Sequence, residues 1–371
     1  MTPERILVVN AGSSSLKLRV LDATDTVVAG ADLPPPRGPE DRPAVAAAVT
    51  GLGSLDAVGH RIVHGGTAFL GPVRLDERVI ARIASLTSLA PLHQPKALDA
   101  LEAVTAAVPD LPAVASFDTA FHAGMPEAAA TYALPAPWRQ RWDLRRYGFH
   151  GLSHAYATRR AGDLLGVPVT DLRLVTCHLG AGASLAAVAA GRSVDTTMGF
   201  TPLEGLVMAT RSGSVDPGLV LWLADHVGMP PAELAATLEH RSGLLGLAGT
   251  ADMREILARA DAGDARARLA LEVYLHRLRR EIAAMTASLG GLDAIVFTGG
   301  VGERSAPVRA MAADGLGYLG IRIDPSRNAD AAAGDREIGE AGAPVRALVV
   351  ESREDVQIAA DVRSVLESAT A

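Results

Sequence analysis

The sequence of 371 residues contains very little cysteine, and Cys177 is the only one. A single cysteine excludes an internal disulfide, and such a composition is typical of proteins from a reducing compartment. The first residues, MTPERILVV, include only a short apolar run and lack the layout of a signal peptide. We therefore expect a cytoplasmic protein.

Long apolar runs and basic blocks are missing as well. No stretch approaches the roughly 18–20 apolar residues that span a bilayer, so we expect no membrane association. The formal net charge is −7, and without a lysine- and arginine-rich block nucleic acid is not an expected partner. Hydrophobic residues make up 49% of the chain and charged residues 21%, which is typical of a soluble globular protein. The length suffices for two domains with separate cores.

What the sequence does have is a repeated apolar strand that ends in a turn rich in glycine or serine. The pattern occurs at Asn10–Ser15, Leu179–Ser184 and Thr298–Gly302. Glycine lets backbone N–H groups surround an anion closely, so three such turns favour a phosphate site over three unrelated hairpins. Because strand, turn and strand begin again near Asp171, we expect two related lobes and not a solenoid.

The first of these turns is not a P-loop. The segment AGSSSLK lacks the G-K-[ST] ending, and residues 16–20 continue as a strand where a P-loop would begin a helix. Phosphates would therefore be held between hairpin turns, and Lys17 would offer them a mobile positive charge.

Further segments predict single elements. Asp32–Pro43 has too many prolines for a regular element and is expected to form a loop. A helix is expected from about Arg74 to Leu89. Apolar residues at steps of three or four predict an amphipathic helix that follows Asp264 as N-cap and ends at Gly290.

Two arginines have no acidic residue near them in the sequence. Arg61 lies in GHRIVHGG and Arg211 in MATRSG. Arginine usually extends to water or forms a structural ion pair. Two arginines in glycine-rich or apolar contexts instead suggest clamps for an oxyanion.

Nine segments together resemble the acetokinase family, the acetate kinases. They stand in the family's order and at family-like distances from residue 10 to about residue 360, and DTTMGFTPLEGLVMATRSG and RRYGFHGLSH are highly specific. The segments are NAGSSSLK, GHRIVHGG, PLHQP, FDTAFH, RRYGFHGLSH, HLGAGAS, DTTMGFTPLEGLVMATRSG, FTGGVGE and SREDVQIA.

The resemblance implies the α/β fold of the actin-like ATPases, a duplicated ribonuclease-H-like architecture with an active site in the cleft between two lobes. The N-terminal lobe would comprise residues 1–122 plus a C-terminal helix, 356–371, and would hold the acyl and phosphate side. Residues 123–355 would form the C-terminal lobe, which binds the nucleotide.

The implied reaction is the reversible phosphorylation of acetate by ATP, which gives acetyl phosphate and ADP by direct in-line transfer. A small carboxylic acid titrates near pH ~4, so acetate is already ionised at pH 7 and needs a cation more than a general base. The resemblance also implies Mg²⁺, with Mn²⁺ as an alternative, a homodimer, and a role in acetyl-CoA biosynthesis.

The resemblance assigns the catalytic roles to Asp118, His150 and Arg211. Asp118 is expected to orient an arginine or the acceptor, His150 to donate to the reacting oxygens, and Arg211 to stabilise the transferring phosphoryl group. Arg61 would bind the acceptor carboxylate. The other implied site residues are Val63, Leu92, Phe149 and Pro202 for the acyl pocket, Asn10 and Glu354 for magnesium, and Lys17, His178, Leu179, Gly180, Ala181, Gly182, Asp252, Met253, Arg254, Gly300, Val301, Gly302, Glu303 and Arg304 for the nucleotide.

The chain departs from the usual family pattern at five positions. Asparagine is common at three of them, aspartate at one and phenylalanine at one. Most of these positions belong to nucleotide contacts, so they concern nucleotide preference more than reaction class. The three asparagine positions hold Gln94, Ala181 and Arg304, the aspartate position holds Ser214, and the phenylalanine position holds Met253.

Three alternatives to this assignment are open. Propionate or butyrate kinase would differ in the size of the acyl pocket. A nonenzymatic nucleotide switch of the actin or Hsp70 kind would need neither Arg61 nor the FDTAFH aspartate. Catalytic zinc at His60/His64 or His150/His154 is disfavoured, because the first pair is expected on a strand and the second lacks the HExxH glutamate.

Overall fold

The computed structural model describes residues 3–12, 15–36, 38–91, 93–330 and 334–368. The chain divides into two compact units. Unit 1 comprises Met1–Ala123, Phe149–Tyr156 and Arg353–Ala371, and unit 2 comprises Gly124–Gly148 and Ala157–Ser352. The expected lobes differ from these units chiefly at residues 149–156, which pack with unit 1.

A six-stranded mixed sheet forms the centre of unit 1, in the order β3-β2-β1-β4-β6-β5. The strands β3, β2 and β1 pair antiparallel, and β1, β4 and β6 then pair parallel. The strands are β1 (Ile6–Ala11), β2 (Leu16–Leu21), β3 (Val27–Leu33), β4 (Ala57–Ile62), β5 (Val73–Arg74) and β6 (Ala113–Phe117).

Unit 2 repeats this topology strand for strand. Read from its other edge, its sheet has the order β9-β8-β7-β10-β12-β11, again with three antiparallel strands followed by two parallel additions and a short antiparallel edge strand. The expected duplication is therefore confirmed. The strands are β7 (Arg173–Leu179), β8 (Ala183–Ala189), β9 (Arg192–Thr196), β10 (Ala294–Thr298), β11 (Arg336–Glu337) and β12 (Arg346–Val349).

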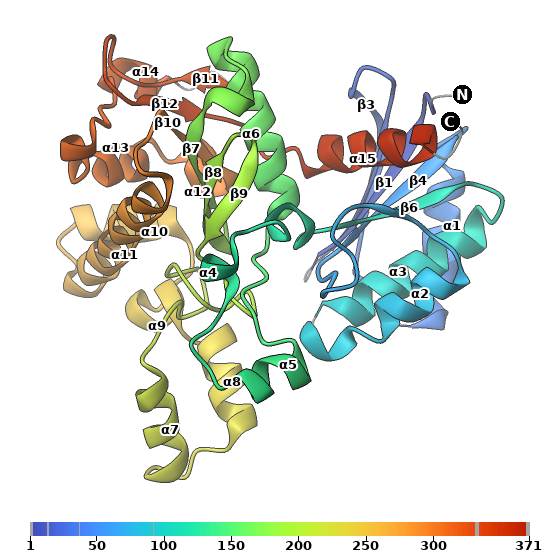
Figure 1. Cartoon of the computed structure of the whole chain (residues 1–371), viewed down its shortest axis with the longest axis horizontal. Coiled ribbons are helices and arrows are strands. Elements are labelled where there is room, and N and C mark those ends of the chain that lie inside the picture. The colour runs from blue at the N-terminus through green and yellow to red at the C-terminus, as the bar shows by residue number, and fades with distance from the viewer. Residues whose placement is uncertain (1–2, 13–14, 37, 92, 331–333, 369–371) are drawn as a thin grey trace. The chain divides into compact units, whose positions relative to one another are not determined.

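Helices cover both faces of the first sheet, and Figure 1 shows α15 on the face opposite to α1 and α3. Because side chains alternate along β1, Leu7 and Val9 enter one core and Ile6 and Val8 the other. Apolar residues on both faces explain the unbroken run ILVV. The helices of unit 1 are α1 (Arg42–Thr50), α2 (Glu77–Ala84), α3 (Gln94–Ala107) and α15 (Glu354–Ser368), with single turns η1 (Pro39–Asp41), η2 (Thr87–Leu89) and η3 (Ala120–His122).

In unit 2 the long helix α11 (Ala265–Leu289) packs against β7, β8 and β9. The helix α6 (Gly151–Leu165) begins in unit 1 and continues in unit 2. Figure 1 shows α7 and α8 extending away from the second sheet. The remaining elements are α4 (Glu127–Ala130), α5 (Ala136–Trp142), η4 (Val169–Asp171), α7 (Pro217–Asp225), α8 (Pro231–His240), α9 (Gly243–Ala248), α10 (Met253–Asp261), α12 (Gly299–Arg304), α13 (Ala306–Asp314), η5 (Gly317–Leu319) and α14 (Pro325–Ala329).

The sequence predicted the bounds of α11 correctly. Asp264 caps the helix by accepting hydrogen bonds from the backbone N–H groups of Arg266 and Ala267, and Gly290 ends it with φ 64°. The proline-rich segment is partly regular, because Pro43 occupies the first turn of α1, where proline is tolerated.

Two expectations need correction. The helix expected from Arg74 to Leu89 is shorter, since α2 ends at Ala84 and residues 87–89 form a separate turn. The third glycine segment is not a hairpin turn, because β10 leads directly into the helix α12. Gly299 permits this with φ +77°, and a Cβ there would lie 2.9 Å from the carbonyl oxygen of Leu179.

None of the helices in the described ranges combines the length and the apolar character needed to cross a membrane.

We predict that Gly59→Ala loosens α15 from the first sheet. A Cβ on Gly59 would lie 2.5 Å from Cγ2 of Ile358 and 2.9 Å from Cγ2 of Val362. Overpacking of this kind should lower the free energy of unfolding by about 1–3 kcal/mol, which urea denaturation can measure. Gly71→Ala is the matched control, because a Cβ at that position meets nothing within 4 Å. Equal stability of the two variants would contradict the prediction.

Candidate active site

The ends of three parallel strands place three polar side chains together in unit 1. Asn10 lies near the end of β1, Arg61 near the end of β4, and Asp118 directly follows β6. The pairing of β1 with β4 and of β4 with β6 brings these ends to the same edge of the sheet. Glu354 joins them from the first turn of α15.

Arg61 is the centre of this cluster. Its Nε and Nη2 donate to the two carboxylate oxygens of Asp118, at 3.0 and 2.6 Å, which is a bidentate pair. Its Nη1 donates to Oδ1 of Asn10 at 3.0 Å and lies 3.7 Å from Oε2 of Glu354. These bonds use three of the five guanidinium N–H donors and leave two for an acceptor.

The surroundings keep the guanidinium charged. Burial lowers the pKa of Arg61, but Asp118 and Glu354 outweigh this effect and raise it above its ordinary value. Burial raises the pKa of the Asp118 carboxyl, and the paired guanidinium opposes that shift. The Asp118 side chain is 2% exposed and that of Arg61 is 16% exposed, so only the arginine reaches solvent.

The residues that follow β6 form the framework of this edge, and we call Asp118–His122 the aspartate turn. The backbone N–H of Asp118 donates to the carbonyl oxygen of Ile62 at 3.0 Å, and Oγ1 of Thr119 accepts from the N–H of Gly65 at 3.0 Å. The carbonyl oxygen of Asp118 accepts from the N–H of Gly151 at 2.8 Å. The turn therefore ties β4 to the segment that carries His150.

His150 has a left-handed backbone with φ +57°, which is unusual for a residue with a Cβ. The preceding residue, Phe149, is buried, and its ring meets that of His64 edge-on at 5.4 Å. Val63 is buried in the same unit. Val63 and Phe149, two of the residues expected in the acyl pocket, are thus both buried. Leu92 lies outside the described residues.

Arg211 lies in unit 2 and is held differently. Its Nη1 donates to the carbonyl oxygen of Pro202 at 3.1 Å and approaches Sδ of Met208 at 3.7 Å. Within the described part of its unit it has no carboxylate within 4 Å. Burial lowers the pKa of Arg211, and Glu239 opposes this only in part. A half-buried guanidinium without a carboxylate partner is suited to bind an anion.

The loop around Arg211 is braced by its backbone. The N–H of Met208 donates to the carbonyl oxygen of Arg211, and the N–H of Ala209 donates to that of Ala181, both at 3.1 Å. A Cβ on Gly243, which has φ +59°, would lie 2.2 Å from the carbonyl oxygen of Met208. Glycine is therefore required at that contact. The contact of Ala209 with Ala181 links this loop to the second glycine turn.

The expected nucleotide segments occupy unit 2, apart from Lys17. The turn of residues 180–182 joins β7 to β8, and α12 follows β10 beside the end of β7. Asp252 caps α10 and pairs with Arg254, which lowers the pKa of Asp252 to about 2. Lys17 is instead exposed on β2 in unit 1, opposite Asn10.

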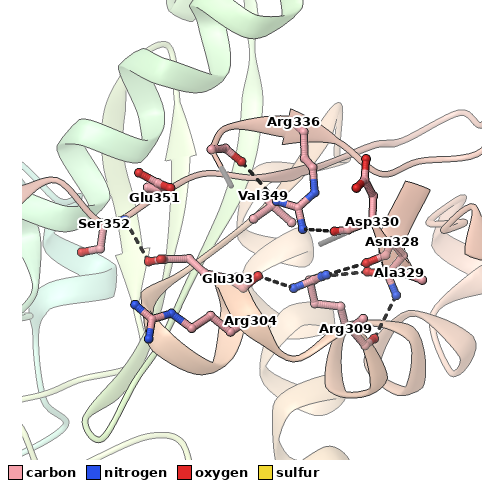
Figure 2. A pocket seen from close by; sticks show the side chains of 12 residues that line it. Glu303, Arg304, Arg309, Asn328, Ala329, Asp330, Arg336, Val349, Glu351 and Ser352 are labelled. Carbon is pink, nitrogen blue, oxygen red and sulfur yellow. Dashed lines mark hydrogen bonds between the residues drawn. The ribbon is translucent and has the colours of Figure 1, made fainter. Parts of the chain in front are cut away.

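Glu303 and Arg304 line a cavity of about 570 Å³ in unit 2. Figure 2 shows Glu303 directed toward Ser352, whose backbone N–H donates to its Oε1 at 2.9 Å. Arg309 is buried and donates only to carbonyl and amide oxygens, so burial and the nearby Arg336 lower its pKa to about 10. Arg309 and Arg336 thus give this cavity a positively charged side next to the segment expected to contact the nucleotide.

The structure gives several departures from the family pattern a local role. Ser214 accepts a hydrogen bond from the N–H of Gly205 through its Oγ at 3.0 Å, and so closes the loop that carries Arg211. Gln94 is buried and donates to the carbonyl oxygens of His64 and Ile83. Met253 is buried, whereas Arg304 is exposed.

Asn10 and Glu354 are the two residues expected to hold a magnesium ion. Nδ2 of Asn10 donates to Oε2 of Glu354 at 3.1 Å, so an amide and a carboxylate lie together at the sheet edge. Hard oxygen donors of this kind fit Mg²⁺, which usually takes one or two protein ligands and completes its shell with phosphate and water. Among the described residues, no three histidine, cysteine, aspartate or glutamate side chains form a group that could hold a metal.

Comparison with known proteins shows the family of this chain. A sequence model of the acetokinase family matches residues 45–360. The chain belongs to the acetokinase family. The expected fold is thereby shown together with the family.

Relatives match over nearly their whole length. An acetate kinase of Leifsonia xyli subsp. xyli is 46% identical over 384 residues, which cover 95% of this chain and 97% of the relative. The crystal structure of Porphyromonas gingivalis acetate kinase has a TM-score of 0.91 at 35% identity and covers 98% of this chain and 100% of that one. A propionate kinase structure from Francisella tularensis has a TM-score of 0.88 at 34% identity, with coverage of 96% and 98%.

We predict that Asp118→Asn destabilises this acetokinase. The amide would leave Arg61 charged beside a weaker acceptor, and breaking a buried ion pair costs about 3–5 kcal/mol. Guanidinium denaturation measures the loss. Replacing both partners, as in Arg61→Met with Asp118→Leu, should recover part of it, because neither member of the bidentate pair then remains buried without the other. A loss below about 1 kcal/mol in the single variant, the range of a surface pair, would contradict the prediction.

Proposed function

We propose that this acetokinase catalyses the reversible transfer of the γ-phosphoryl group of ATP to acetate, which gives acetyl phosphate and ADP. The observation that carries the proposal is the contrast between its two arginines. Arg61 is fixed by Asp118 and keeps two N–H donors, whereas Arg211 is half-buried and has no carboxylate partner in the described part of its unit. Arg61 is suited to bind a small carboxylate, and Arg211 is suited to stabilise the negative charge that develops on the phosphoryl group during transfer.

The acceptor needs no general base. Acetate is ionised at pH 7, and one of its oxygens attacks the γ-phosphorus while the bond from that phosphorus to the bridging oxygen of ADP breaks. Arg61 would bind the carboxylate through its remaining donors and reduce repulsion by the phosphate. Asp118, held in a bidentate pair, would orient Arg61 and abstract no proton.

The phosphoryl group carries the charge that catalysis has to stabilise. Arg211 would donate to its equatorial oxygens, and His150 would donate to the same oxygens. Since the loop of Arg211 is braced by backbone contacts, its guanidinium would need little reorganisation when the charge develops. His178, the turn of residues 180–182, Asp252–Arg254 and Gly300–Arg304 would hold the nucleotide, with Lys17 reaching its phosphates.

Magnesium would be held at Asn10 and Glu354. When bound, it supplies charge neutralisation for the phosphates of ATP.

A cytoplasmic location is also part of this proposal. The sole cysteine, Cys177, is buried.

A second candidate is propionate kinase. The P. gingivalis acetate kinase and the F. tularensis propionate kinase are nearly equally similar to this chain, with TM-scores of 0.91 and 0.88. Overall similarity therefore does not separate the two substrates. The pocket of Val63, Leu92, Phe149 and Pro202 would decide, and one extra methylene changes binding by only about 1–3 kcal/mol. Some turnover of propionate is therefore expected.

We predict that hydroxylamine traps an acyl phosphate formed by the purified protein with Mg-ATP and acetate. Arg211→Ala should reduce this product at least about 10²-fold, the usual effect of losing one transition-state donor. Its fold should persist, because no carboxylate in the described part of its unit lies within 4 Å and would lose a partner. Arg211→Lys keeps the charge without the planar fork and is the matched control, with intermediate activity expected.

Parallel reactions with propionate, butyrate or no acid, and with magnesium omitted, identify the acceptor. Acetate above the other acids supports the proposal. A stronger propionate signal keeps the chemistry but transfers the assignment to propionate kinase. No hydroxamate with any acid, in a protein that binds ATP, would instead indicate a nonenzymatic nucleotide switch.

A homodimer is also part of this proposal, and α7 supports it. The helix buries none of its residues although most of them are apolar. Leu221 is 64% exposed and Trp222 51%, with Val215, Leu219 and Val227 also exposed nearby in the sequence. Adjacent exposed apolar residues of this kind commonly mark an association surface.

We predict that Leu221→Arg reduces the mass measured by light scattering from that of a dimer to that of a monomer, because the arginine would bury a charge in the contact. Leu269→Arg is the matched control, since Leu269 is similarly exposed, at 52%, on α11. A monomeric mass for the unaltered protein would contradict the proposed homodimer. If Leu221→Arg and Leu269→Arg change the mass to the same extent, α7 is not the specific dimer contact.

A further inference from the structure

The residues on both sides of His150 are tied to the aspartate turn. On one side, the N–H of Gly151 donates to the carbonyl oxygen of Asp118 at 2.8 Å. On the other side, the carbonyl oxygen of Phe149 lies 3.1 Å from Nε2 of His122. The left-handed residue therefore stands between two hydrogen bonds that lead to the same turn.

The first of these two ties is enforced by shape. A Cβ on Gly151 would lie 2.3 Å from the carbonyl oxygen of Asp118, so only glycine permits the close approach. The second tie depends on a side chain. His122 is fully buried in η3, and its ring meets those of Phe121 and His154 edge-on at 5.5 and 5.6 Å. Rings on two sides limit rotation of the imidazole.

The chemistry of the second tie fixes the proton on His122. A carbonyl oxygen only accepts, so Nε2 carries the hydrogen. Burial lowers the pKa of His122 to about 4, so at neutral pH the ring is uncharged and Nδ1 has no hydrogen. The bond to Phe149 is thus a neutral bond made by one defined tautomer.

We propose that His122 is a positioning residue that holds His150 in its left-handed conformation through the carbonyl of Phe149. The proposal rests on the proposed function, in which His150 donates to the transferring phosphoryl group. Without this bond, the peptide between Phe149 and His150 could rotate toward an ordinary backbone conformation. The imidazole of His150 would then leave its place. A phenylalanine at position 122 could fill the space, but it could not hold the carbonyl.

The test is a double-mutant cycle between His122→Phe and His150→Ala, read as kcat and KM in the hydroxamate assay. In the otherwise unaltered protein, His122→Phe should lower kcat about tenfold, equivalent to about 1.4 kcal/mol, with little change in KM for acetate. In the His150→Ala background the same substitution should have less than about a twofold effect. Equal losses in both backgrounds would overturn the proposal, because they would show a general effect on packing.

Two further variants separate the hydrogen bond from packing. His122→Gln places an amide N–H near the position of Nε2 and should recover most of the lost kcat. If His122→Phe does not fold, the cycle is run with His122→Gln and His150→Ala instead. A folded His122→Gln variant that fails to retain activity would overturn the proposal. His60→Gln is the control for loss of a buried histidine elsewhere in unit 1, with unchanged kcat expected.

The unaltered protein distinguishes the two levels of failure. If it forms no acyl hydroxamate, the proposed function fails before His122 is considered. If it is active and the cycle is additive, the function stands and the positioning role of His122 is wrong.

Discussion

The bidentate bond between Arg61 and Asp118 is the constraint on which the proposed acceptor site depends. It joins the end of one central strand to the turn that follows the neighbouring strand, and a third N–H of the same guanidinium donates to Asn10 on another strand. Burial makes each unpaired member costly, so the strands, the aspartate turn and the start of α15 have to be in register together. The result is a cation whose position is fixed but whose remaining donors stay available.

The two arginines show two ways in which a fold can hold positive charge. Arg61 is surrounded by acidic and amide oxygens, which preserve its charge and fix its plane. Arg211 contacts a carbonyl oxygen and a sulfur, and its position depends on a loop braced by glycine. The first arrangement favours binding of an anion already charged. The second leaves more of the cation's field for charge that appears only during transfer.

The sequence predicted the duplicated topology, α11 and the elements that carry the site, because these depend on local patterns of apolar residues, caps and glycines. The partner of Arg61 was expected only in outline, because Asp118 is 57 positions away and only the sheet brings the two together. The role of His122 was not predictable from the sequence, because it depends on the hydrogen bond to the carbonyl oxygen of Phe149, which only the fold brings near. The helix α12 was mistaken for a turn because glycine suits both, and the backbone of Gly299 decides between them.

The duplicated architecture has a consequence for the order of synthesis. The helix α15 supplies one of the two cores of unit 1 and also contributes Glu354 to the cluster around Arg61, yet it follows the whole of unit 2 in the chain. While the ribosome is still making unit 2, the first sheet therefore has one uncovered apolar face. The N-terminal unit cannot mature first, and the proposed acceptor site is completed only when the last helix arrives. A nascent or prematurely ended chain thus lacks an assembled site.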